Sequence, residues 1–141
     1  MPLVLPFLER VLLTAWVGSL WVTGFIVAPV LFALLEDRAQ AGSIAGSLFS
    51  ITALLGMACG SVLLLATIYR KGRFGWAAWV ILVMLLLVAI GQFVLVPAIG
   101  ELRQQGLVDS VHFGQLHGLA GVLFLFTSVL GLVLVGAGHP D

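Results

Sequence analysis

Four long apolar segments, separated by short polar stretches, decide what this chain can fold into. They run approximately over residues 7–35, 43–69, 75–99 and 111–136. A helix needs about 20 mostly apolar residues to span a bilayer, and each segment is long enough. The apolar runs are continuous rather than alternating, so a membrane barrel of strands is excluded. The sequence predicts one all-α domain over residues 1–141, an integral membrane four-helix bundle.

Composition and charge agree with this prediction. The chain is 62% hydrophobic and 9% charged, whereas a soluble domain carries about 25% charged residues. Six basic and six acidic residues give a net charge of zero. Because a nucleic-acid-binding surface needs an excess of basic side chains, we expect the lipid bilayer, and no nucleic acid, as a partner.

The distribution of basic residues predicts the orientation of the bundle. Short loops make sequential helices antiparallel neighbours, in an up-down order. On one side of the membrane lie Arg10, Arg70, Lys71 and Arg73. On the other side lie only Arg38 and Arg103. Since loops rich in Lys and Arg stay in the cytoplasm, we expect both termini there, in a multi-pass protein of the bacterial inner membrane.

Small residues indicate where helices approach closely. Three GxxxG patterns occur, at Gly42–Gly46, Gly56–Gly60 and Gly114–Gly118. The residues expected to pack helices together are Gly42, Gly46, Gly56, Gly60, Gly118, Gly121, Pro29 and Trp21. These faces could meet within one bundle, between two copies in a homo-oligomer, or against a membrane partner protein.

Polar groups are expected in one layer on the outer side. At 1.5 Å per residue, Gln92 lies about 10 Å and His117 about 9 Å below the outer surface. Ser47 and Ser50 fall at a similar depth, and Pro29 frees the carbonyl of Phe25. Because His117 shares a helical face with Phe124 and Ser128, it is expected to point into the bundle. Above this layer the sequence places an acidic mouth, formed by Glu36, Asp37, Glu101 and Asp109.

Two interpretations of this layer remain open. In the structural one, Gln92 and His117 hydrogen-bond across helices and hold the bundle together. In the functional one, His117 is a proton acceptor or ligand, Gln92 its hydrogen-bond partner and Glu101 lies at the mouth. One His and one Gln are too few ligands for a metal, so we expect no metal and no cofactor.

No catalytic motif is present. The chain lacks a P-loop, a dinucleotide-binding fingerprint, GxSxG and HExxH. We therefore expect a non-enzymatic component for small transport, ligand binding or assembly. One alternative is a haem- or metal-linked membrane redox protein that uses His117, and another is a helix–helix interaction module.

Three stretches resemble a known family. They are WVGSLWVTG at residues 16–24, APVLF at 28–32 and AGSIAGSLF at 41–49. They are similar to bacterial members of the transmembrane protein 205-like family, four-helix membrane proteins of unknown function. More distantly, the arrangement resembles copper-resistance D proteins and the HemJ-type protoporphyrinogen oxidases. The oxidases rely on a His in the first helix, which this chain lacks, so the resemblance implies an inner-membrane protein without an oxidase site.

Overall fold

The computed structural model describes residues 4–72 and 74–137. These residues form helices joined by short turns, with no strand among them. The elements, in chain order, are α1 (Val4–Val22), the π-helical turn η1 (Thr23–Val27), α2 (Ala28–Leu34), α3 (Arg38–Lys71), α4 (Trp76–Ile90), the π-helical turn η2 (Gly91–Leu95), α5 (Val96–Gln104) and α6 (Val111–Gly136).

These elements make four continuous helical stretches. The first joins α1, η1 and α2, the second is α3, the third joins α4, η2 and α5, and the fourth is α6. Each of the four is long and apolar enough to cross a membrane. The all-α prediction with four candidate membrane spans is therefore confirmed.

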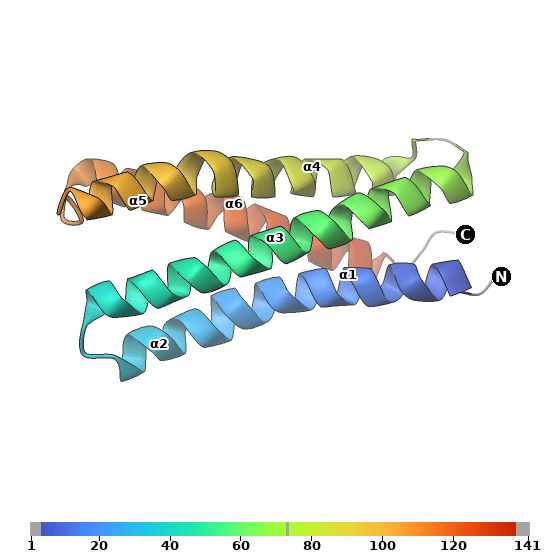
Figure 1. The fold of residues 1–141 in the computed structure, drawn as a ribbon. Helices are drawn as coiled ribbons and strands as arrows, with labels where there is room; N and C mark the ends of the chain where they lie inside the picture. The colour runs from blue at the N-terminus through green and yellow to red at the C-terminus, as the bar shows by residue number, and fades with distance from the viewer. Residues whose placement is uncertain (1–3, 73, 138–141) are drawn as a thin grey trace.

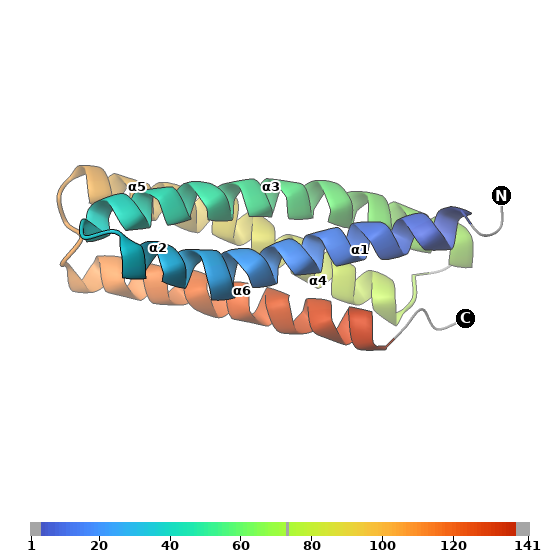
Figure 2. The same ribbon diagram turned by 90° about the horizontal axis from the view of Figure 1, so that it is seen from below.

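The four stretches lie around a common core. The first stretch packs against α3 and α6, and the third stretch also packs against α3 and α6. The first and third stretches thus lie diagonally across the bundle. Figures 1 and 2 show that successive stretches run back and forth along it. We call the end with the α2–α3 and α5–α6 connections the outer end, and the opposite one the inner end.

Two helix boundaries differ from the prediction. The second stretch begins at Arg38, because the Asp37 carboxylate caps it by accepting hydrogen bonds from the backbone N–H groups of Ala39 (2.8 Å) and Gln40 (3.2 Å). The third stretch continues to Gln104, although residues 100–110 were predicted to form a loop. Polar residues mark where the hydrocarbon layer ends, whereas a helix can extend beyond it into water.

The inner half of the core is built around one tryptophan. Trp16 is fully buried, and its indole lies against Gly56 and Gly60 of α3. A Cβ atom at Gly60 would lie 2.6 Å from Cζ3 of Trp16, which is too close for a real side chain. The GxxxG pattern at Gly56–Gly60 therefore packs within this chain.

Most of the surface around the sides of the bundle is apolar. Large hydrophobic side chains are exposed on every stretch, among them Phe7, Leu65, Trp79 and Leu125. In water such a surface would drive aggregation, whereas in a bilayer it contacts acyl chains. The structure therefore agrees with a surface that contacts lipid.

Candidate functional site

One hydrogen bond joins two helices in the outer half of the bundle. The hydroxyl oxygens of Thr23 in η1 and Thr52 in α3 lie 3.0 Å apart, and Thr52 is buried. At the same level Gly24 makes room for Phe124 of α6, because a Cβ at Gly24 would collide with the Phe124 ring. The first, second and fourth stretches thus meet in one layer.

Gln92 of the third stretch reaches the same layer. Leu85 lies at the same level of the bundle as Trp16, since the side chains of both lie close to Gly60. Gln92 is seven residues farther outward, about 10 Å along the helix. Gly131 of α6 lies at the level of Trp16 too, against Val17 and Met84. Phe124 is seven residues farther outward along α6, so it reaches the level of Gln92.

Two buried polar atoms near this layer have no hydrogen-bond partner among the described residues. The Oε1 atom of Gln92 and the Nε1 atom of Trp21 are inaccessible to solvent, and neither makes a hydrogen bond to a described residue. An unmade buried hydrogen bond costs about 1–3 kcal/mol. This layer therefore holds a buried acceptor on Gln92 and a buried donor on Trp21, and the Nε1 donor of Trp16, in the core, is likewise buried without a partner among the described residues.

Both diagonal stretches pass through a π-helical turn at this depth. In η1 the N–H of Ala28 donates to the carbonyl of Thr23, just before Pro29. In η2 the N–H of Val96 donates to the carbonyl of Gly91, just before Pro97. Proline supplies no N–H, so the ladder shifts by one residue ahead of it. Such π-turns occur frequently at functional sites, and Gln92 lies inside the second one.

Aromatic rings surround the layer on the side of the first stretch. Trp21 stacks on Phe25 with 4.6 Å between ring centroids. Phe124 lies 6.1 Å from Phe25 and 5.2 Å, edge to face, from Phe49. Trp21 also packs against the buried core, as expected for a packing residue. The surroundings of the Trp21 indole are therefore aromatic.

His117 does not point into the bundle, contrary to the expectation. Its side chain is exposed on α6, where the imidazole stacks on Phe113 with 6.0 Å between centroids. The inner part of the same face is buried at Ser128 and Gly131, because α1 packs against it. Farther out, α2 packs against α3, and in Figure 1 it diverges from α6. The structure thus does not bring Gln92 and His117 together.

Arg103, which the sequence analysis did not single out, lies at the outer mouth. A Cβ at Gly42 would lie 3.5 Å from one guanidinium nitrogen of Arg103, and a Cβ at Gly46 would lie 3.9 Å from the other. The Gly42–Gly46 pattern therefore faces a side chain of α5, with Phe32 of α2 also 3.8 Å from the Gly42 position. Glu101 is exposed on the same helix.

The remaining predicted packing residues lie at the surface. Gly118 and Gly121 are exposed, and a Cβ at either position would meet no atom within 4 Å. Pro29 is exposed too. Among the polar residues expected in the layer, Ser47 is exposed and donates to the carbonyl of Ser43, while Ser50 is half-buried.

Metal ligands do not converge in the described residues. Within residues 4–72 and 74–137, no three His, Cys, Asp or Glu side chains lie close enough to hold one ion. Cys59 is buried in the apolar core of the inner half, beside the Trp16 cluster.

An ion pair lies at the inner end of the bundle, far from this site. The guanidinium of Arg70 in α3 is 3.3 Å from Oε2 of Glu9 in α1. The Glu9 side chain is 1% exposed and that of Arg70 is 28% exposed. The pair joins the first two stretches at the inner end of the bundle. Glu9 and Arg70 were not among the site residues predicted from the sequence.

Comparison with known proteins gives one relationship. No curated protein and no solved structure matches this chain. A family model described as a domain of unknown function (DUF4149) matches residues 11–107, more than half of the chain. The match includes Gln92 and Trp21 and ends before His117. The chain belongs to the DUF4149 family, whose function is unknown.

Proposed function

We propose that this chain is a non-enzymatic, multi-pass protein of the bacterial inner membrane that binds a small polar ligand in the outer half of its bundle. The observation that carries this proposal is the buried Oε1 atom of Gln92, which has no partner among the described residues. A ligand hydroxyl or amine would donate a hydrogen bond to this atom. The Trp21 N–H offers a donor for an acceptor atom of the ligand.

Energetics support a functional role for Gln92. A polar side chain within the membrane is costly when no protein group satisfies it, and such residues mark ligand or ion sites. If Gln92 served only to hold helices together, its amide would hydrogen-bond to a neighbouring helix. No such bond to Gln92 Oε1 occurs within the described part of the chain.

The outer mouth suits the entry of a polar ligand. In the proposed orientation, with the inner end and both termini in the cytoplasm, exposed Glu101 and half-buried Arg103 lie at the periplasmic surface. His117 lies outside the bundle, so it would act as proton acceptor or ligand only for a molecule on the outer face of α6.

Retention of the ligand tests the proposal. The full chain is purified gently in detergent, and its small molecules are extracted and measured by mass spectrometry beside a Gln92→Leu variant. Gln105→Leu, at an exposed position in the outer turn, is the matched control. We expect a small molecule at near-stoichiometric amounts in the wild type and control, and its loss from Gln92→Leu. Identical extracts from all three proteins would contradict the proposal.

A second candidate function is assembly through α6. Of the three GxxxG patterns, only Gly114–Gly118 is exposed, and the built Cβ positions at Gly114, Gly118 and Gly121 meet no atom within 4 Å. Small residues on a lipid-facing helix allow a second helix to approach closely. This face would serve a homo-oligomer or a membrane partner protein.

A further inference from the structure

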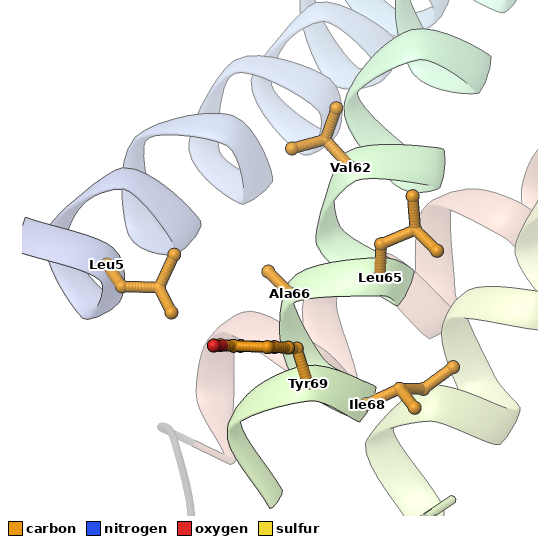
Figure 3. A pocket seen from close by; sticks show the side chains of 6 residues that line it. All are labelled: Leu5, Val62, Leu65, Ala66, Ile68 and Tyr69. Carbon is orange, nitrogen blue, oxygen red and sulfur yellow. The ribbon is translucent and has the colours of Figure 1, made fainter. Parts of the chain in front are cut away.

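An apolar groove runs between α1 and α3 at the inner end. It is a shallow groove, open to the surroundings, with a volume of about 620 Å³. One wall is Leu5 of α1. The other wall belongs to α3 and is formed by Val62, Leu65, Ala66, Ile68 and Tyr69, as Figure 3 shows. The lining is almost entirely hydrocarbon, with the Tyr69 hydroxyl as its polar group.

The α3 wall of the groove faces away from the other helices, on the side of the bundle. Leu65 is 68% and Tyr69 is 86% exposed, so no other described helix covers this wall. In Figure 3 the Tyr69 ring extends across the inner end of the groove, with its hydroxyl toward α1. Tyrosine favours this arrangement at a membrane interface, since its ring is apolar and its hydroxyl reaches water.

Positive charge gathers at the same end. Arg70 follows Tyr69 directly, and its pair with Glu9 bridges α3 and α1, the two helices that wall the groove. A guanidinium has five N–H donors, and the 28% exposure of Arg70 leaves part of the group open to a further acceptor. Arg10, in the next position after Glu9, is exposed. The pair with Glu9 also holds the Arg70 side chain in place, which lowers the entropy lost on binding.

The opposite end of the bundle carries the opposite charge. Glu36, Asp37, Glu101 and Asp109 outnumber Arg38 and Arg103 there. An anionic headgroup is therefore attracted to the inner end and repelled from the outer one. Charge complementarity thus selects both the end of the bundle and the headgroup of a lipid bound there.

We propose that the groove between α1 and α3 binds one phospholipid with an anionic headgroup. One acyl chain lies along Val62, Leu65 and Ala66. The phosphate accepts hydrogen bonds from Arg70 and from the Tyr69 hydroxyl. This site is separate from the Gln92 layer, so the test of lipid binding is independent of the test of the proposed function.

Lipid retention measured by native mass spectrometry tests this proposal. The full chain is reconstituted in vesicles of equal parts phosphatidylglycerol and phosphatidylcholine, extracted in mild detergent, and examined for bound lipid. We expect one phosphatidylglycerol per chain in preference to phosphatidylcholine. Ala66→Trp fills the groove and is expected to abolish this retention. Ala58→Trp, at an exposed position of α3 two turns away, is the control and should retain the lipid.

The charge requirement is tested separately, with the buried carboxylate neutralised together with its partner. The double variant Glu9→Gln/Arg70→Gln removes the guanidinium donors and leaves the net charge unchanged, so it should lower phosphatidylglycerol retention through the lost phosphate contact alone. Arg38→Gln, at the outer end, should leave retention unchanged. Tyr69→Phe, which removes one hydroxyl from an exposed side chain and leaves the fold intact, should lower retention as well. Equal retention of both lipids, or equal retention by Ala66→Trp and Ala58→Trp, would overturn the proposal and indicate ordinary surrounding lipid only.

Discussion

The indole of Trp16 occupies the place that a side chain at Gly56 would take. A Cβ at Gly56 would lie 2.8 Å from Cδ1 of Trp16, so the α1–α3 contact requires a glycine at this position. Gly60, one turn farther along α3, leaves room in the same way for the other end of the indole. The pair of glycines thus forms a notch that fixes the register of the first two stretches.

Replacing Gly56 by Ala is expected to destabilise the bundle. The added methyl group overlaps the rigid indole of a fully buried Trp16, and overpacking costs about 1–3 kcal/mol. The free energy of unfolding in mixed detergent micelles measures the effect. Gly118→Ala is the control, because its Cβ meets nothing within 4 Å. Equal stability of the two variants would show that Trp16 does not occupy the notch.

Removing Arg70 is expected to weaken the inner end. Arg70→Gln removes the guanidinium that lies 3.3 Å from the Glu9 carboxylate, whose side chain is 1% exposed. Breaking a fully buried pair costs about 3–5 kcal/mol, and the partial exposure of Arg70 reduces this figure. Glu9→Gln/Arg70→Gln should recover part of the loss, because the buried carboxylate charge is removed together with the guanidinium. A double variant that unfolds more easily than Arg70→Gln would contradict this account of the pair.

Substituting His117 is expected to leave the bundle unchanged. The side chain is exposed and its ring contacts only Phe113 among the aromatic contacts of the described residues. His117→Ala should therefore alter the free energy of unfolding by about 0.5 kcal/mol or less. A large loss of stability, measured in the same micelles, would mean that the imidazole contributes to helix packing after all.

Substituting Gly118 tests assembly through α6. Gly118→Leu adds a large side chain to an open surface position, so a single bundle should keep its stability. If α6 joins two copies by close approach, the variant should dissociate to a smaller species in size-exclusion chromatography with light scattering. An unchanged mass for both proteins would exclude this face as the interface.

The spans and the depth of Gln92 were predictable, because both follow from simple lengths. A stretch of about 20 apolar residues crosses a bilayer, and a rise of 1.5 Å per residue sets the level of a side chain. The level of Gln92 in the outer half follows from the same rise and stays a prediction.

The orientation of His117 was wrong because a helical face was treated as uniform along its length. Phe124 packs against Gly24 and Phe25 of η1, but beyond this π-turn α2 packs on α3 and diverges from α6 (Figure 1). Periodicity reports which residues share a face, and says nothing of where the neighbouring helix ends its contact. The GxxxG patterns likewise do not show which side chain lies opposite them. Gly56–Gly60 receives Trp16, Gly42–Gly46 lies close to Arg103, and Gly114–Gly118 is exposed.

Gln92→Leu gives the most direct test of the central claim, that this amide is buried for a ligand and not for the fold. Because Oε1 has no partner among the described residues, leucine removes an unmade hydrogen bond that costs about 1–3 kcal/mol. The variant, stripped of small molecules like the wild type, should therefore unfold at the same or a higher free energy. A loss of about 1 kcal/mol or more would contradict the account, since Gln92 would then be a structural bond between helices.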